Sequence, residues 1–525
     1  MLSKKNIFFY SLIFFGIYCS VFIGASYDEF FHHDNGERRL KYLLSFGVFE
    51  YYEILHFRYY PGLYDTLSYF LSIAFPLKFK IEVFHLINFL ISLSSIIALT
   101  KVVKIFFDKK ISYIFFLLTF FNPIFFGHMS INSKDTVIAC ANFWILYYII
   151  RYFKSQSHNS KSIISTKLAL FLGLGAGVRV VFLGTLIPYL FFIFFEIFYI
   201  KKLSKGINLK LFYSHIFKIF LISYFLVILC WPNAHENIFT QPFLLIKESL
   251  SDLSQGVQGS LFAGIFYETE STPWYYLFIN FFFKLPIIIV FSFLLSIIFS
   301  YKINAFYKGT IKNFTYKFFL CFFFMLLPIL TAILFNLKMH DGLRYFLYLI
   351  PFFNIPIALY LFYLYKNKVF FFNKILIIFL STLFIFFTFN FIKITPYHYS
   401  YLNYFNKIFL TNNSFENDYW GTSLKELVYK FSKSDNLVNN PKIAVCGANP
   451  HVIDFYLNKY GVSNYQKTDI NKVFDYAFII NRTLTVKDAI TNKTLFSSCF
   501  TKFKNNKNFL SIKKNNSVLS KIVIK

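Results

Sequence analysis

The stretch FFFNKILIIFLSTLFIFFTFNFIK, at residues 370–393, decides the fold class of this chain of 525 residues. It is almost continuously apolar and long enough to cross a bilayer, because a transmembrane helix needs about 20 such residues. Similar runs recur along the chain and predict a polytopic α-helical membrane protein. We expect about eleven spans, at residues 7–26, 82–105, 111–127, 135–153, 163–181, 182–200, 211–231, 275–299, 315–336, 344–365 and 370–393.

The composition favours a membrane protein and excludes other classes. Hydrophobic residues make up 57% of the chain and charged residues 15%, whereas a soluble domain carries about a quarter charged residues. This apolar content excludes both an ordinary soluble enzyme and a disordered chain. The chain also has 53 Lys and Arg against 25 Asp and Glu. In a soluble protein this basic excess would favour nucleic-acid binding.

The basic residues instead follow the predicted topology. If Lys4 and Lys5 are cytoplasmic, every predicted inner loop carries lysine or arginine, and Asp108 is the one acid in these loops. Basic loops are typical of the cytoplasmic side of a membrane protein. We therefore predict contacts with membrane lipids and no nucleic-acid partner.

Two segments leave an alternative open. Residues 62–77 are interrupted by Asp65 and Pro76 and predict an interfacial or re-entrant helix, with a twelfth span as the alternative. A twelfth span would invert every later loop and destroy the basic pattern. The first span is predicted to be a retained anchor, and a cleaved signal peptide is the alternative.

The polar stretches divide the chain into two regions. Residues 1–394 are predicted to form the membrane domain, with outer loops at about 27–81 and 232–273. Residues 395–525 then stay outside, and their length is enough for a small extracytoplasmic domain.

This C-terminal region carries the pattern of a small α/β module. Lys442–Gly447 and Asp475–Asn481 predict short buried strands, and His451–Tyr460 predicts an amphipathic helix. Cys446 and Cys499 lie in the same region, where an oxidising compartment permits a disulfide. The sequence alone leaves their pairing open.

Carboxylates that could perform chemistry follow the first span. Asp28 or Glu29 could deprotonate an acceptor hydroxyl or hold a metal. The alternative is an acidic pair that marks the outer end of a helix. His32, His33 and Asp34 are weaker candidate ligands for a divalent metal, because adjacent histidines point apart in most conformations.

A polar turn between two apolar helices offers a candidate phosphate site. The segment FGHMSINSKD (Phe126–Asp135) contains His128 and ends on Lys134 and Asp135. Lys134 lies near a helix start on the outer side, where a phosphate can bind. The alternative is that Asp135 only caps the next helix.

Two arginines near membrane ends are further candidates for phosphate binding. HDGLRYFLY begins at His340 and places Asp341 and Arg344 one helical turn apart. Arginine forms two parallel hydrogen bonds to a phosphate, and the alternative is an Asp341–Arg344 ion pair. Arg179 lies in GAGVRVV. The alternative to phosphate binding is that its side chain snorkels to the membrane interface. Together these residues predict an outer pocket for a lipid-linked phosphate.

Several longer motifs resemble a known family when they are taken in chain order. They are Asp28-Glu29, YPGLY (Tyr60–Tyr64), FNPIFFGHMSINSKDT (Phe121–Thr136), GVRVV (Gly177–Val181), TPWYY (Thr272–Tyr276), DGLRYFLYLIP (Asp341–Pro351), TPYHYSYLNYFN (Thr395–Asn406) and DYWGTSLKEL (Asp418–Leu427). They resemble glycosyltransferase family 39, the dolichyl-phosphate-mannose–protein mannosyltransferase type of the GT-C superfamily. The resemblance covers most of residues 1–430.

This resemblance implies an integral membrane glycosyltransferase with a polyprenyl-phosphate sugar donor and an active site on the outer face. It implies that Asp28 activates the acceptor and that Glu29 orients the acceptor or supports Asp28. Arg344 would bind the lipid phosphate, with Lys134 or Arg179 as candidate second cations. Direct displacement at the anomeric carbon would invert its configuration.

The resemblance leaves the cofactor and the acceptor open. His128 and Asp135 match a motif without an implied role, and some GT-C relatives use a divalent metal whereas others do not. The tail resembles neither a sugar-binding β-trefoil nor a tetratricopeptide array, so a protein, a lipid or a glycan remains a candidate acceptor. The AT-rich composition and short loops favour a bacterial inner membrane, with the site facing the periplasm.

Two other classes compete with a glycosyltransferase. A transporter or flippase of lipid-linked sugars would be expected to carry polar groups in mid-span and an internal repeat. A polysaccharide polymerase or ligase would be expected to rely on outer arginines and a histidine rather than on a carboxylate after the first span. The outer position of Asp28 favours the glycosyltransferase.

Overall fold

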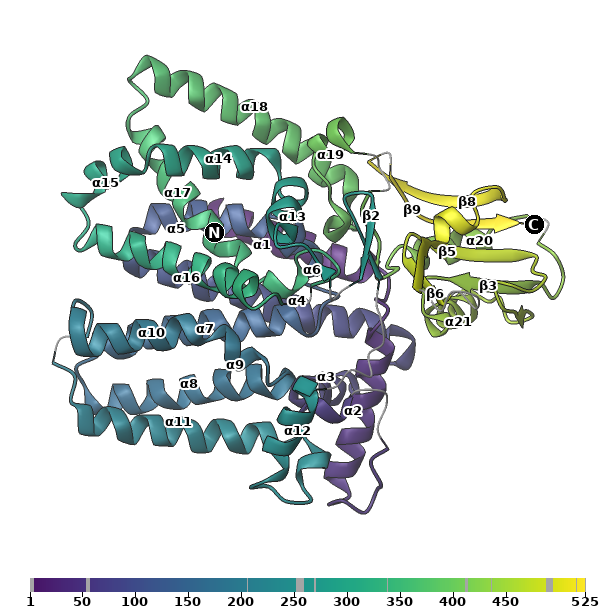
Figure 1. Ribbon diagram of the computed structural model, residues 1–525, viewed down its shortest axis with the longest axis horizontal. Helices are drawn as coiled ribbons and strands as arrows, with labels where there is room; N and C mark the ends of the chain where they lie inside the picture. The colour runs from purple at the N-terminus through teal and green to yellow at the C-terminus, as the bar shows by residue number, and fades with distance from the viewer. Residues whose placement is uncertain are drawn as a thin grey trace.

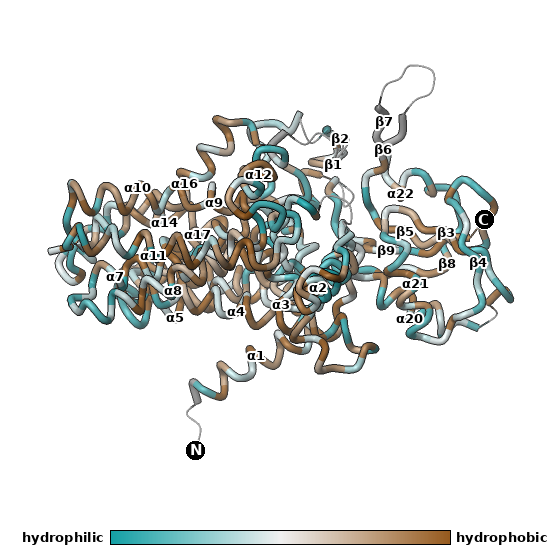
Figure 2. Tube along the Cα trace, turned by 90° about the horizontal axis from the view of Figure 1, so that it is seen from below, coloured by the Kyte–Doolittle hydropathy of each residue, from teal (hydrophilic) through white to brown (hydrophobic). Residues whose placement is uncertain are grey.

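The chain folds into a bundle of helices with a β-sheet module at one end (Figure 1). The computed structural model describes residues 4–52, 57–204, 206–251, 259–268, 271–337, 339–410, 414–435, 437–487, 494–515 and 517–524. Parts of the predicted outer loop 232–273, at 252–258 and 269–270, lie outside the described residues. Figure 2 shows that apolar residues follow the helices, whereas hydrophilic residues are frequent on the module.

The longer helices are α1 (Lys4–Phe22), α4 (Lys80–Phe106), α5 (Lys109–Phe120), α7 (Asp135–Lys154), α8 (His158–Val178), α11 (Leu209–Leu229), α14 (Ile287–Ile298), α16 (Phe314–Leu334), α17 (Ile350–Lys366) and α18 (Phe371–Ile394). Shorter helices of the bundle are α2 (Glu29–Leu44), α3 (Leu63–Ser72), α6 (Pro123–His128), α9 (Phe182–Thr185), α10 (Ile187–Phe195), α12 (Gln241–Ser251), α13 (Tyr276–Lys284), α15 (Ser300–Lys308) and α19 (Tyr404–Phe409). The 3₁₀ turns used below are η1 (Phe57–Tyr59), η6 (Arg344–Phe346) and η7 (His398–Ser400).

The helical membrane architecture predicted from the apolar runs agrees with the structure in its main features. Six helices of the described residues are long and apolar enough to cross a bilayer, and a bent helix pair raises this number to seven. The six are Leu77–Phe106, Asp135–Lys154, His158–Val178, Leu209–Leu229, Phe314–Leu334 and Phe371–Ile394. The segment expected to be interfacial forms α3, whose ten residues are too few to span a bilayer.

Several of the other expected spans are interrupted, and their sequences explain why. The run 275–299 divides into α13 and α14, which meet at 118° beside Pro286, because proline lacks the N–H that a continuous helix needs. The run 111–127 breaks at Asn122, whose side chain accepts hydrogen bonds from the first amides of α6. The run 344–365 becomes α-helical at Ile350, after the turn η6. The last two breaks fix the positions of His128 and Arg344.

The lysine-rich connections and the β-sheet module lie at opposite ends of the bundle. The segment that links α10 to α11 and the segment that links α17 to α18 both lie at the end away from the module (Figure 1). They carry the lysine pairs Lys201, Lys202 and Lys366, Lys368. This arrangement matches the separation of charge on which the predicted topology was based.

The C-terminal module contains a five-stranded mixed sheet in the order β4-β3-β5-β9-β8. Its elements are α20 (Leu424–Ser432), β3 (Lys442–Cys446), α21 (Pro450–Lys459), β4 (Gln466–Lys467), β5 (Tyr476–Ile480), α22 (Cys499–Lys502), β8 (Lys507–Lys514) and β9 (Ser517–Ile524). Two hairpins lie outside this sheet, β1 (Gly259–Phe262) with β2 (Ile265–Glu268), and β6 (Thr483–Lys487) with β7 (Thr494–Ser498). Strands β3 and β5 and helix α21 occur where the sequence predicts them. Cys446 and Cys499 form a disulfide.

The module is attached to the helical bundle by polar bonds and by close backbone packing. Lys425 of α20 and Lys459 of α21 both pair with Glu82 of α4, at 2.9 and 2.7 Å. The backbone N–H of Ala25 donates to the Tyr456 hydroxyl of α21 over 2.7 Å. At Gly127, an added Cβ would lie 2.0 Å from the backbone nitrogen of Tyr399 in η7, and the Tyr399 ring packs in turn against Tyr419, just before α20 of the module. These contacts hold the module against the segment that follows α1.

Candidate active site

Asp28 and Lys134 form the centre of the candidate site. Asp28 lies directly before α2, and Lys134 lies directly before α7. Lys134 Nζ donates to Asp28 Oδ2 over 3.0 Å. The side chains keep 33% and 20% of their surface exposed, so a substrate group has access to both. The fold thus brings together two residues from separate predicted outer loops.

The local charges keep Asp28 ionised. Burial alone would raise the pKa of its carboxyl, but the nearby charges of Lys134, His32 and Arg344 together lower the pKa well below its usual range. A charged carboxylate accepts hydrogen bonds and can receive a proton. The surrounding cations therefore limit the basicity of Asp28. This basicity increases when one of the cations binds another anion.

Arg344 approaches this centre from η6, and three residues close to it in sequence contact its guanidinium. Its Nη1 lies 3.1 Å from Asp341 Oδ2, and its Nη2 donates to His340 Nε2 over 2.8 Å and to the Tyr345 hydroxyl over 2.7 Å. Burial lowers the pKa of His340 to about 4, so the imidazole stays neutral and can accept this bond. The Asp341–Arg344 ion pair, which the sequence offered as an alternative to phosphate binding, is therefore present.

The turn before Arg344 requires its glycine. Asp341 and Gly342 both have positive φ, 55° and 72°, a region in which glycine is strongly favoured. The Gly342 N–H donates to the Tyr276 hydroxyl over 2.9 Å. An added Cβ at Gly342 would lie 2.2 Å from Nζ of Lys284. Lys284, from α13, is a cation of the site that the sequence did not suggest.

Arg179 reaches the same region from the end of α8. Its guanidinium lies 5.4 Å from the ring centre of Tyr60, and Arg179 is close enough to Tyr345 and Asp135 to interact with them electrostatically. Tyr60 belongs to the YPGLY segment. The fold thus places Arg179 near Arg344 rather than at an isolated membrane end.

The YPGLY segment is held in place by a buried arginine. Arg39 of α2 is fully buried and donates to the backbone carbonyls of Tyr60, Phe57 and Cys230 over 2.7, 2.9 and 2.6 Å. Gly62 has φ of 76°, and an added Cβ would lie 2.6 Å from this guanidinium. The glycine is therefore needed for both the turn and the close approach of Arg39.

His128 and Asp135 belong to the wall behind Lys134. Asn132 links them, because its Nδ2 lies 3.3 Å from His128 Nδ1 and donates to Asp135 Oδ2 over 2.9 Å. The Tyr419 hydroxyl lies 3.2 Å from His128 Nε2. Burial lowers the pKa of His128 to about 3. Both predicted residues therefore shape the turn that presents Lys134.

The structure adds Arg482, which sequence reasoning missed. It follows β5, and its Nη1 donates to the Tyr419 carbonyl over 2.5 Å and lies 3.9 Å from Asp341 Oδ1. Its guanidinium also lies 5.6 Å from the Tyr27 ring, next to Asp28. Arg482 is the one arginine of residues 395–525 among many lysines, and this was the signal that could have identified it.

The side chain of Glu29 contacts α4 and the segment that precedes α2. Its Oε1 lies 2.8 Å from His85 Nε2 of α4, and its Oε2 accepts a hydrogen bond from the Ser26 backbone N–H. Glu29 also lines a hollow of about 300 Å³ with His32 and Asp65. These contacts fix the start of α2 and direct the Glu29 carboxylate toward His85 and Ser26.

The His32–Asp34 run does not converge on one point. His32 Nδ1 lies 2.9 Å from Asp65 Oδ2, the His33 ring packs against Phe84, and Asp34 pairs with Arg38. Consecutive residues of a helix point in different directions, about 100° apart. In the part of the chain that the structure describes, no group of three or more His, Cys, Asp or Glu side chains is arranged to hold a metal ion. The structure therefore does not bring His32, His33 and Asp34 together as one ligand set.

Comparison with known proteins finds similar solved structures, two of which are described here. No protein-family model matches the chain, and no curated protein does. The chain is similar to the crystal structure of ArnT from Cupriavidus metallidurans in the apo state, with a TM-score of 0.48 and 10% sequence identity. It is also similar to that of ArnT from Cupriavidus metallidurans bound to undecaprenyl phosphate, with a TM-score of 0.46 and 10% identity. Both matches cover 99% of this chain and 97% of the other.

Proposed function

We propose that this chain is a membrane glycosyltransferase that transfers a hexosyl or pentosyl group from a polyprenyl-phosphate donor to an acceptor hydroxyl. The observation that carries the proposal is the Asp28–Lys134 pair at 3.0 Å, within electrostatic range of Arg344. A base for the acceptor and cations for a phosphate therefore lie side by side. The family resemblance of the motifs supports the same reaction.

The arrangement supports a direct displacement. The acceptor oxygen attacks the anomeric carbon and gives its proton to Asp28, while the bond from that carbon to the phosphate oxygen breaks. The negative charge that develops on the leaving phosphate is stabilised by Arg344, with Lys134 and Arg179 as further cations. Attack opposite the leaving group inverts the configuration of the anomeric carbon.

Donor binding would also strengthen the base. In the free protein Lys134 lowers the pKa of Asp28. A donor phosphate that binds Lys134 shares its positive charge, so the pKa of Asp28 rises when the donor is present. Asp28 then accepts a proton more readily at the moment when the anomeric carbon lies next to the acceptor.

We further propose that residues 1–394 form the catalytic membrane domain with eleven spans and that the site faces the periplasm of a bacterial inner membrane. The support is the separation of the basic connections from the module (Figure 1). Mannosyl transfer is one case of this reaction. The acceptor is a protein, a lipid or a glycan of the cell envelope.

The experiment measures sugar transfer by the purified full-length chain with a panel of polyprenyl-phosphate sugars and native membrane acceptors. We expect transfer from one donor class, and competition by undecaprenyl phosphate. Arg344→Ala should raise the donor concentration needed for half-maximal rate by about tenfold to a hundredfold, since a charge-assisted hydrogen bond contributes about 1.5–3 kcal/mol. Arg38→Ala, which removes a partly exposed arginine paired with Asp34, is the matched control.

Three results would contradict the proposal. Unchanged donor saturation in Arg344→Ala would reject the phosphate role of Arg344. Movement of intact lipid-linked sugar across vesicles without transfer would instead identify the transporter that the sequence offered as an alternative. Chain elongation of a lipid-linked glycan without a monosaccharide donor would identify a polymerase or ligase.

A further inference from the structure

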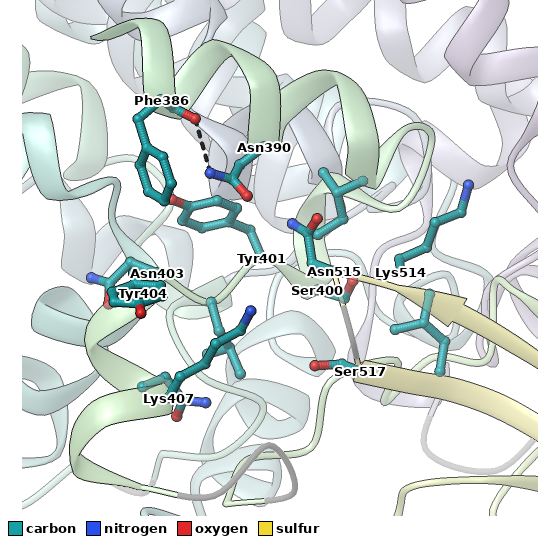
Figure 3. A pocket seen from close by; sticks show the side chains of 14 residues that line it. Phe386, Asn390, Ser400, Tyr401, Asn403, Tyr404, Lys407, Lys514, Asn515 and Ser517 are labelled. Atoms are coloured by element: carbon teal, nitrogen blue, oxygen red, sulfur yellow. Dashed lines mark hydrogen bonds between the residues drawn. The ribbon is translucent and has the colours of Figure 1, made fainter. Parts of the chain in front are cut away.

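A second pocket lies apart from the Asp28–Lys134 pair, between the end of α18, the η7–α19 segment and the hairpin of β8 and β9 (Figure 3). Its cavity volume is about 30 Å³, within about 540 Å³ of space between atoms that includes open solvent. We name it the α18 pocket. Neither Asp28 nor Arg344 lines it, so the proposed transfer reaction does not use it.

The α18 pocket continues an apolar surface. Phe386, Phe389 and Ile392 of α18 expose 47%, 66% and 63% of their surface, although the helix is apolar enough to span a membrane. Side chains of this kind on a spanning helix face lipid. Phe386 and Ile394 line the pocket, so acyl chains that lie along α18 have a continuous path to its mouth.

The rest of the lining is polar and cationic. Asn390, Asn403 and Ser517 contribute polar groups, and Lys407 of α19 and Lys514 of β8 contribute positive charge (Figure 3). The described lining contains no Asp or Glu. The two lysines make this lining positively charged, and Glu426 is an acid outside the lining that interacts electrostatically with Lys514.

Lys514 is held in position and keeps bonding capacity. Its Nζ donates to the Thr395 carbonyl over 2.9 Å, and it lies 5.5 Å from the Tyr397 ring centre. An ammonium group has three N–H donors, so this bond leaves donors for a ligand. Lys407 is exposed beside the Tyr404 ring. Two cations near the outer end of an apolar helix are the arrangement that attracts an anionic lipid head group.

We propose that the α18 pocket binds the phosphate head group of an anionic phospholipid, with its acyl chains along α18. The bound lipid connects the hairpin of β8 and β9 to the membrane surface and so helps to hold the C-terminal module over the bundle. The proposal does not rest on the transfer reaction, because none of the residues that carry it belongs to the Asp28 site.

The test uses the delipidated full-length chain and native mass spectrometry. Wild type is titrated with phosphatidylglycerol, with phosphatidylcholine and with inorganic phosphate. Lys407→Gln/Lys514→Gln removes both cations, Lys407→Arg/Lys514→Arg keeps the charge, and Lys366→Gln/Lys368→Gln is the matched control at the other end of α18. Each variant is first checked for an intact Cys446–Cys499 disulfide and an unchanged unfolding temperature.

We expect the most tightly bound phosphatidylglycerol to bind the glutamine pair at least about tenfold more weakly than wild type, because each basic residue near an anionic lipid contributes to its binding. The arginine pair and the inner control should bind it as wild type does. Equal binding of phosphatidylcholine, or no loss in the glutamine pair, would overturn the proposal. Binding of inorganic phosphate with the same affinity would also overturn it, since the acyl chains would then contribute nothing.

Discussion

Asp28, Lys134 and Arg344 are held by the ends of apolar helices, whereas Arg482 is held by a disulfide-linked sheet. The first group is fixed by short local bonds, such as Asn132 with Asp135. Arg482 depends on strand pairing, because its carbonyl accepts from the Cys499 N–H over 3.1 Å and Cys499 is bonded to Cys446. In the proposed reaction the bundle therefore supplies the base and the main phosphate ligands, and the module supplies one additional cation.

Loss of the disulfide should give the largest difference between the two regions. Cys446→Ser/Cys499→Ser removes a link that spans 53 residues, and a loop of this length contributes about 3–5 kcal/mol to stability. We expect the module to unfold at a lower temperature and the helical bundle to keep its helix content. Hydrogen exchange measured separately for β5 and α7 checks this. Equal weakening of both would show that the two regions unfold as one unit.

Gly127 tests the packing between the two regions. In Gly127→Ala the new methyl group meets the backbone of Tyr399 at 2.0 Å, and such overpacking costs about 1–3 kcal/mol. We expect a lower unfolding temperature and a lower transfer rate, because the module moves away from Asp28. Gly309→Ala is the control, since an added Cβ there meets nothing within 4 Å. Equal effects of the two substitutions would contradict the proposed role of this contact.

Arg482 tests whether the module takes part in the reaction. Arg482→Gln should reduce kcat/KM by about tenfold, which corresponds to about 1.4 kcal/mol of transition-state stabilisation. Arg482→Lys should recover part of the rate because it keeps the charge. Lys467→Gln removes an exposed cation that pairs with Asp454 on the same module and should leave the rate unchanged. A wild-type rate in Arg482→Gln would show that Arg482 takes no part in the reaction and that the site is formed by the bundle alone.

The pH dependence should be the smallest effect. The pKa of Asp28 is lowered and the pKa of His340 is lowered to about 4, so neither group changes charge between pH 8 and pH 5. The unfolded His340 binds its proton near its usual pKa of about 6.5, so folding loses stability as pH falls from that value toward 4. We expect a flat transfer rate over pH 5–8 and a lower unfolding temperature below pH 6. A histidine-like drop in rate near pH 6.5 would contradict this account.

Much of the fold followed from local patterns in the sequence, because apolar length predicts helices and alternation predicts strands. Strands β3 and β5 and the short helix α3 are examples. The breaks at Asn122 and Pro286 were readable from residue type, yet the long apolar runs on either side masked them. The prediction of an outer pocket grouped Asp28, Lys134 and Arg344 because each belongs to a predicted outer end.

The remaining features depend on tertiary contacts that no local pattern contains. Glu29 was expected to orient the acceptor or to support Asp28, but its carboxylate lies next to His85 of the neighbouring α4. His32 and His33 are adjacent in sequence and still have different partners, since helix geometry separates them. Arg482 lies far from the bundle in sequence, and only the docking of the module brings it to Asp341.

The most direct test of the central claim compares sugar transfer by wild type with transfer by Asp28→Asn, using the donor that wild type accepts. Asp34→Asn, six residues further along in α2 and partly exposed beside Arg38, is the matched control. We predict that Asp28→Asn lowers the transfer rate by at least about a hundredfold, as expected for loss of a general base, with folding and donor binding retained. Transfer at the wild-type rate by a folded Asp28→Asn protein would contradict the role of Asp28 as the base.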